Sequence, residues 1–314
     1  MAHAMIERFQ ALESAFTDAS RRSERLSARF AAAAALDTDS DIATTVRRAL
    51  RERDALDTLV SRWTYPAKPM RLVYGAALAS ANRDAGAFAE IKAALKAVRK
   101  RRGGRRLSFE GAGAALTLTA SGASDGHVDI FFDILEGVAA PWWRRDAPSE
   151  EAYAAIMAAD GETPETAQAR LAKARESMLA AGVPGRHVNK AVFEVALANP
   201  GPMWFSRNWT ALSVAARSRK GLVRHVGLSG LAILAAQVED GSAAGDALID
   251  AQSAILSLKP KPRGMVAGRL SLRLAVAING RKTPGAAARD LSAIFAAQQA
   301  AVIAATSAAV VAAT

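Results

Sequence analysis

The sequence predicts an all-α protein built as an array of helical hairpins, and three observations support this prediction. Alanine fills 75 of the 314 positions, and alanine favours helix because it loses no side-chain entropy when the backbone coils. Apolar residues recur at helical spacing in the longer segments. Those amphipathic segments alternate with shorter apolar segments of small residues, so we expect almost no sheet.

An internal repeat gives the array its period. The segments "RHVNKAVFEVALA" at 186–198 and "RHVGLSGLAILAA" at 224–236 share Arg-His-Val and an alanine-rich apolar face, 38 residues apart. A wider series of five arginines recurs every 38 to 41 residues, at Arg106, Arg145, Arg186, Arg224 and Arg263. Arginine is common enough for chance to produce much of that series, whereas the paired Arg-His-Val segments are harder to dismiss.

A period near 40 residues is typical of an α-solenoid, in which each two-helix hairpin buries its second face by stacking on its neighbours. The pattern is similar in kind to tetratricopeptide, HEAT and armadillo arrays. It lacks their signature residues, such as the tetratricopeptide Trp, Leu-Gly and Tyr spacing. The similarity therefore implies an architecture of about twelve or more helices and no particular function.

The N-terminal part looks less regular than the rest. Apolar residues at helical spacing predict one amphipathic helix over residues 5–30 and a second over 41–63, which together would form a leading hairpin. We therefore expect a less regular N-terminal helical pair at 1–66 and a hairpin-repeat domain at 67–314. Glycine, proline and threonine punctuate the later segments in the positions expected of helix ends.

Several protein classes are disfavoured by composition. The chain has no cysteine, which excludes disulfides, thiolate nucleophiles and cysteine-ligated metals. Glu7 and Arg8 interrupt the N-terminus before an apolar run of signal-peptide length, so we expect a cytoplasmic protein. The closing segment 300–314, "AAVIAATSAAVVAAT", is short and alanine-based. It predicts a docked terminal helix in preference to a membrane anchor, and we expect no membrane partner.

The net charge of +11 is distributed in bands along the chain. The bands carry −1 over residues 1–60, +9 over 61–110, −6 over 111–160, +6 over 161–225 and +3 over 226–314. Arginine outnumbers lysine by 31 to 10, which suits bidentate anion recognition but equally reflects a GC-rich, bacterial coding sequence. The banding favours a protein-interaction scaffold unless the fold brings the basic bands together and turns the acidic band away.

The stretch "RKRRGGRRLSFEGAG" at 99–113 holds the densest cationic cluster. Phe88, Ile91, Leu95 and Val98 predict the buried stripe of the preceding helix. The opposite, solvated face of that helix carries four cations: Lys92, Lys96, Arg99 and Lys100. Cations in the last turn complement the helix dipole, and the pair at 103–104 supplies a glycine exit. That structural account leaves the further arginines around the glycines unexplained.

We therefore treat a set of cations as a candidate anion-binding edge, with a solvated helix end as the alternative. If the hairpins stack in register, residues one period apart emerge at the same edge, so the periodic arginines would form a ridge that continues the cluster. The alternative for the ridge is that each arginine caps a helix or pairs with a local carboxylate. The candidate residues are Arg99, Lys100, Arg101, Arg102, Arg105, Arg106, Arg145, Arg186, Arg224 and Arg263.

Tryptophans beside arginines form a second candidate surface. Trp142 and Trp143 lie in "PWWRRD", and Trp204 and Trp209 lie in "MWFSRNWT". Such residues could anchor a peptide or stack on bases through cation–π contacts. They could equally be wedges between hairpins.

No catalytic motif is visible. "GAGAAL" at 111–116 has no glycine or alanine at the third fingerprint position and no surrounding βαβ pattern. The histidines show no metal-ligand spacing, and no Gly-x-Ser-x-Gly elbow is present. We expect a non-enzymatic scaffold without a cofactor or metal that binds a protein or peptide; the alternative is binding of nucleic acid or another polyanion through the edge around residues 99–106.

Overall fold

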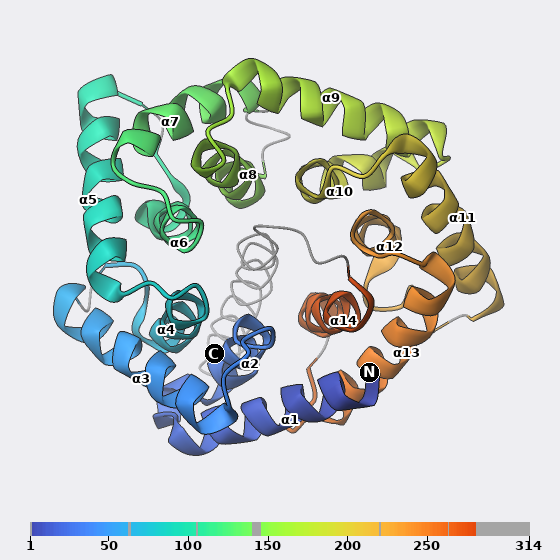
Figure 1. Ribbon diagram of the computed structural model, residues 1–314, viewed down its shortest axis with the longest axis horizontal. Coiled ribbons are helices and arrows are strands. Elements are labelled where there is room, and N and C mark those ends of the chain that lie inside the picture. The colour runs from blue at the N-terminus through green and yellow to red at the C-terminus, as the bar shows by residue number, and fades with distance from the viewer. Residues whose placement is uncertain are drawn as a thin grey trace, which may run out of the picture.

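Two concentric rings of helices make up the fold (Figure 1). The computed structural model describes residues 2–61, 64–104, 106–139, 146–219, 221–262 and 264–280. Within these ranges it contains fourteen α-helices and three short 3-10 helices, and no strand. The all-α prediction is confirmed, and so is the arrangement of the chain as successive helical hairpins.

Odd-numbered helices form the outer ring and even-numbered helices form the inner ring (Figure 1). Successive outer helices begin 38 to 43 residues apart, in agreement with the period of the sequence. The outer helices are α1 (Ala2–Ala19), α3 (Ile42–Leu59), α5 (Ala85–Arg102), α7 (Gly126–Val138), α9 (Pro164–Ala180), α11 (Pro202–Ser218) and α13 (Gly241–Ser257). The inner helices are α2 (Ala28–Ala34), α4 (Arg71–Ser80), α6 (Ala112–Ala120), α8 (Ala147–Ala159), α10 (Gly185–Ala198), α12 (Gly227–Gln237) and α14 (Gly264–Asn279).

The two rings use different residues because their surroundings differ. Outer helices have one wet face, and four of them begin at a side chain that accepts a backbone hydrogen bond, at Asp41, Asp84, Thr163 and Asp240. Inner helices lie between two neighbours and an outer helix, so they are buried almost all round: every residue of α2 is buried, as are residues 150–158 of α8. This is the origin of the alternating amphipathic and small-residue apolar segments.

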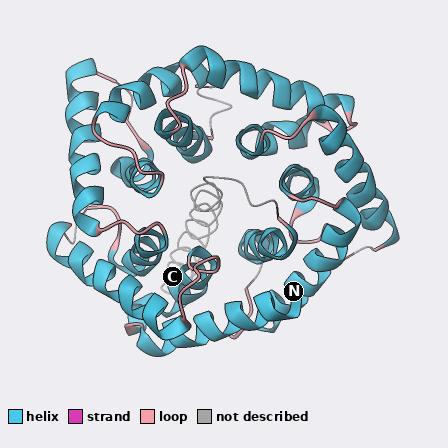
Figure 2. Cartoon of the chain, in the orientation of Figure 1, coloured by secondary structure: helices cyan, strands magenta, loops and turns pink. Residues whose placement is uncertain are grey.

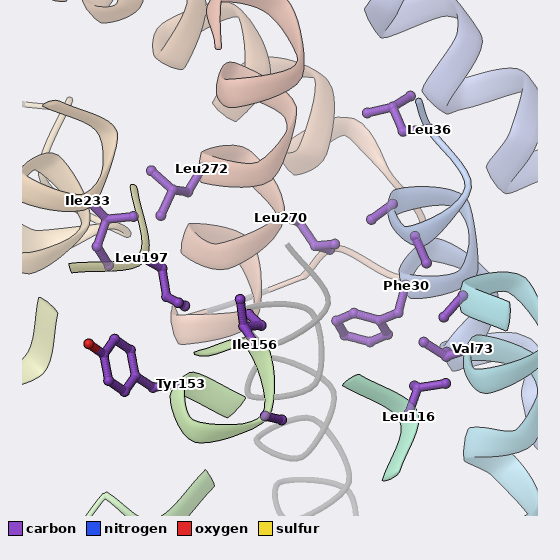
Figure 3. Close-up of a cluster of buried hydrophobic side chains, with 14 of the residues drawn as sticks. Phe30, Leu36, Val73, Leu116, Tyr153, Ile156, Leu197, Ile233, Leu270 and Leu272 are labelled. Atoms are coloured by element: carbon purple, nitrogen blue, oxygen red, sulfur yellow. The ribbon is translucent and has the colours of Figure 1, made fainter. Parts of the chain in front are cut away.

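Apolar side chains of the inner helices belong to one buried cluster, part of which is drawn in Figure 3. Phe30 of α2 and Leu116 of α6 are almost completely buried, and so are their counterparts on the other inner helices. The labelled side chains of Figure 3 are Phe30, Leu36, Val73, Leu116, Tyr153, Ile156, Leu197, Ile233, Leu270 and Leu272. Burial of this apolar surface is the main stabilising contribution to such a core.

The array closes on itself. Helix α1 packs against α13 and α14, and α14 packs against α2, so the last hairpin contacts the first. Two long-range polar contacts reinforce the closure: Arg29 Nη1 donates to the carbonyl of Pro260 at 3.0 Å, and Arg273 pairs with Asp37. The expected superhelical array is therefore a ring in which the terminal hairpins are neighbours.

The N-terminal part joins this ring differently from the expectation. The first helix ends at Ala19, and the short α2 follows a 3-10 turn (Arg22–Ser27), so α1 and α2 form the first hairpin. The expected second helix is α3, the outer helix of the next hairpin. It packs closely on α4, which begins just beyond the expected boundary at 66/67. Residues 2–61 thus contribute to the same ring as the later hairpins.

The predicted terminal helix at 300–314 lies outside the described residues. Among the residues that the structure describes, no helix has the length and hydropathy needed to cross a bilayer.

Candidate functional site

Positive and negative residues are concentrated in different sets of connections between the helices of the ring. We define the basic rim as the connections that lead from each outer helix into the following inner helix: 20–27, 60–70, 103–111, 139–146, 181–184, 219–226 and 258–263. We define the acidic rim as the connections that lead from an inner helix to the next outer helix: 35–41, 81–84, 121–125, 160–163, 199–201 and 238–240. In sequence, the basic rim holds 15 Lys and Arg against 3 Asp and Glu, whereas the acidic rim holds 1 Arg against 9 Asp and Glu.

These two rims lie on opposite faces of the molecule. The chain reverses direction at every connection, so the seven inner helices run parallel to one another. Figure 2 shows the short connections that leave the inner helices on the face toward the viewer. The N-terminal ends of the inner helices, and with them the described residues of the basic rim, therefore lie on the far face.

Three of the five periodic arginines fall on the basic rim side of this ring. Arg106 precedes α6, Arg186 is the second residue of α10, and Arg224 precedes α12; all three side chains are exposed. Three other members of the predicted edge lie outside the described residues: Arg105, Arg145 and Arg263. The register predicted from the sequence therefore has a physical basis at three positions, since each lies at the start of an inner helix.

Two arginines of the cluster have a structural role that the sequence did not reveal. Arg101 and Arg102 at the end of α5 both contact Asp129 of α7 at 2.8 Å, and Arg102 also contacts Asp133 at 2.6 Å. Hydrogen bonds from Arg102 and then Arg101 lower the pKa of Asp129. Their guanidinium groups join neighbouring outer helices, and anion binding by these two arginines stays a prediction.

Other cations near the basic rim have no carboxylate partner within the described part of the chain. They come from five of its connections and from the last turn of α5. These residues are Arg22, Arg25, Lys68, Arg99, Lys100, Arg106, Arg224, Lys259 and Lys261. All are exposed except Arg99, which is half-buried. They keep their charge available for an external anion.

A cavity of about 550 Å³ opens beside the cluster, between the end of α3, one face of α5 and the connection 103–111. Lys92, Lys96 and Arg99 line it from successive turns of α5. The sequence predicts that solvent covers this face of α5. The alanines at 89 and 93, interleaved with the cations, leave the space that the cavity occupies. The cavity could have been inferred from this alternation of alanines and cations along α5.

Arg106 and Glu110 complete the charged part of the cavity. Lys92 donates to the carbonyl of Tyr65 and lies 3.9 Å from a carboxylate oxygen of Glu110. Burial lowers the pKa of Lys92, and this effect outweighs the attraction of Glu110. The described lining therefore combines four cations with one carboxylate.

The connection that carries Arg106 has an unusual backbone. Phe109, Glu110 and Gly111 all have positive φ, at 50°, 57° and 76°. Such a conformation is unfavourable for the first two residues and persists where several contacts enforce it. The Tyr65 ring packs edge-on against Phe109, and the Tyr65 amide donates to Glu110 at 3.3 Å. The wall of the cavity is thus held in place from the connection 60–70 and from α5 rather than by local sequence preference.

The tryptophans of the second candidate surface have structural contacts where the structure describes them. Trp209 is buried in the core. Trp204 is half-buried and donates from Nε1 to the carbonyl of Val238 at 3.0 Å, and the Arg207 guanidinium lies 4.7 Å from its ring. Trp204 thereby joins α11 to the connection that follows α12. A binding role for the tryptophans stays a prediction. Trp142 and Trp143 lie outside the described residues.

Within the described ranges, no group of three or more histidine or acidic side chains is arranged to hold a metal ion. Comparison with known proteins gives no functional assignment to set beside this geometry. Neither a protein-family model, nor a curated protein, nor a solved structure matches the chain.

Proposed function

We propose that this protein is a non-enzymatic binding protein that holds a polyanion, such as a nucleic acid, against its basic rim. The observation that carries the proposal is the separation of charge between the two faces of the ring. A continuous array of cations attracts a polyanion and releases its counterions. The carboxylates of the acidic rim lie on the opposite face. The acidic band that separates the basic bands in the sequence is therefore no objection to a basic surface.

The closure of the ring gives the basic rim its densest described part. Arg29 joins α2 to the carbonyl of Pro260, so the connections 20–27 and 258–263 are neighbours although they are more than 230 residues apart in the chain. Arg21 of this junction pairs with Asp54 and Asp57. Four further exposed cations project from the two connections: Arg22, Arg25, Lys259 and Lys261. A polyanion lying across this junction meets cations from both ends of the array.

The test is binding of heparin and of a labelled single-stranded oligonucleotide across a range of salt concentrations. A rim variant changes Arg22, Arg25, Lys259 and Lys261 to glutamine. Its affinity should fall, and its logarithmic salt slope should become shallower by about three, because each lost phosphate contact removes about 0.7–0.9 from the slope.

A matched control removes the same charge elsewhere. It changes Arg47, Arg48, Arg83 and Lys173 to glutamine; these four residues are exposed and lie outside the basic rim. The control should keep the wild-type slope. Equal losses in the two variants would show that only net charge matters, and absence of heparin retention at low salt would overturn the proposal.

A scaffold for a protein partner is the second candidate. Met203 is 88% exposed and Val214 is 52% exposed, and their spacing of eleven residues places them on the same face of α11. An exposed apolar pair of this kind favours a protein surface. The heparin experiment separates the two candidates, because a scaffold that acts through α11 requires no anion binding.

A further inference from the structure

We infer that the cavity beside α5 is a binding site for a small organic anion with an apolar part, such as an aryl phosphate. The cavity lies at the part of the basic rim formed by the connections 60–70 and 103–111. Binding of a small anion there does not depend on polyanion binding. Its volume of about 550 Å³ lies within the usual range for small-molecule sites.

The charged groups of the cavity converge from two elements. Lys92, Lys96 and Arg99 follow one another at spacings of four and three, so they lie along one face of α5. Arg106 approaches from the connection 103–111. Glu110 is the one acidic residue of the described lining, and it is already engaged by the Tyr65 amide and by Lys92. The excess of cations favours an anionic ligand over a neutral or cationic one.

The apolar part of the lining indicates that the ligand carries an apolar group beside its anionic group. Leu59 at the end of α3 is 52% exposed, whereas Val60 and Leu107 beside it are almost buried. An exposed leucine at the mouth of a cationic cavity gains stability when an apolar group covers it. A ligand with a ring or short hydrocarbon next to its anionic group contacts both the cations and the apolar side chains of the lining. A free inorganic anion contacts only the cations.

The enforced backbone at 109–111 supports the assignment independently of charge. Two consecutive residues with side chains, Phe109 and Glu110, adopt left-handed conformations next to the cavity. Residues held in this way cluster at ligand sites, where the surrounding structure determines the conformation. Here the result is a wall that presents Arg106 and Leu107 to the cavity without rearrangement.

The experiment measures binding of 1-naphthyl phosphate by its fluorescence, with neutral 1-naphthol and inorganic phosphate as comparison probes. A pocket variant changes Lys96 and Arg106 to glutamine; both side chains are exposed, so the fold should be retained. We expect 1-naphthyl phosphate to bind the wild type more tightly than either comparison probe. Its dissociation constant should rise about tenfold or more in the pocket variant, as expected for loss of charge-assisted hydrogen bonds.

A control variant changes Lys100 and Arg224 to glutamine, which removes the same charge at exposed positions outside the lining. It should bind 1-naphthyl phosphate like the wild type. The rim variant (Arg22, Arg25, Lys259 and Lys261 to glutamine) should do so too, so failure of the polyanion proposal leaves this result unchanged. Equal binding of 1-naphthol, equal weakening in the pocket and control variants, or no binding to the wild type would overturn the inference.

Discussion

Replacing Gly268 with alanine is expected to lower the free energy of unfolding by about 1–3 kcal/mol, the usual cost of overpacking. Gly268 lies in α14, where the helix touches the backbone of the turn before α12. A Cβ atom at this position would lie 2.1 Å from the carbonyl oxygen of His225 and 2.7 Å from its carbonyl carbon. Backbone atoms cannot rotate away as a side chain does, so the two inner helices must separate.

The matched control is Gly113→Ala in α6, another inner helix. No heavy atom lies within 4 Å of the Cβ that this substitution adds. Alanine should therefore raise stability there by up to ~1 kcal/mol, through its higher helix propensity. Urea unfolding of the two variants measures the difference. If both alanines change stability in the same direction, close approach of the inner helices does not determine the effect at Gly268.

Much of this packing follows from local pattern, which explains what the sequence predicted well. The Arg-His-Val segments at 186 and 224 occupy the starts of α10 and α12, one hairpin apart. The stripe of Phe88, Ile91 and Leu95 is buried as its spacing predicts. Residue identity and periodicity determine which face of a helix is apolar, so these features can be inferred from one sequence.

Closure of the ring depends on a quantity that one sequence does not display. The rotation from each hairpin to the next sets whether an array spirals or closes, and small packing differences accumulate over seven steps. The contacts that complete the ring, Arg29 with Pro260 and Arg273 with Asp37, join residues more than 230 positions apart. Nothing in the local pattern at either end indicates its partner.

The candidate site also combines features that the local sequence predicts with features that depend on tertiary packing. The cationic cluster at 99–106 was evident from composition, but its members have different roles that depend on neighbouring helices. Arg101 and Arg102 contact carboxylates of α7, whereas Lys96 and Arg99 line a cavity completed by α3. A helical stripe of cations is consistent with solvent, an ion-pair network or a binding site, and only tertiary packing distinguishes these environments.

The second large effect is expected at Arg71, the first residue of α4. Its side chain is 3% exposed and donates to Asp57 Oδ1 at 2.8 Å and to the carbonyls of Ser61 at 2.8 Å and Pro66 at 3.2 Å. One guanidinium therefore joins the end of α3, the basic rim and the start of an inner helix. Arg71→Met keeps most of the buried stem but leaves these acceptors without their donor, which should cost about 3 kcal/mol of unfolding free energy.

The control for Arg71 is Arg101→Met, which removes an exposed arginine from an ion pair. The Arg101 side chain is 63% exposed, and its partner Asp129 keeps Arg102. Exposed ion pairs contribute little because water and salt screen them. The unfolding curve of this control should therefore be close to that of the wild type, and a loss comparable to that of Arg71→Met would contradict a role specific to the buried network.

Measurements across pH separate the Arg71 network from simple loss of packing. Burial raises the pKa of Asp57, but hydrogen bonds from Arg21 and Arg71 lower it by more, so its net shift is downward. A depressed folded-state pKa stabilises the protein above the unfolded value of about 3.9, and this contribution is lost as the pH falls through the folded pKa. Arg71→Met should weaken the depression, so its free energy of unfolding should fall less steeply below about pH 4 than that of the wild type. Parallel pH profiles for the two proteins would show that the loss comes from packing alone and that Arg71 does not act through the Asp57 carboxylate.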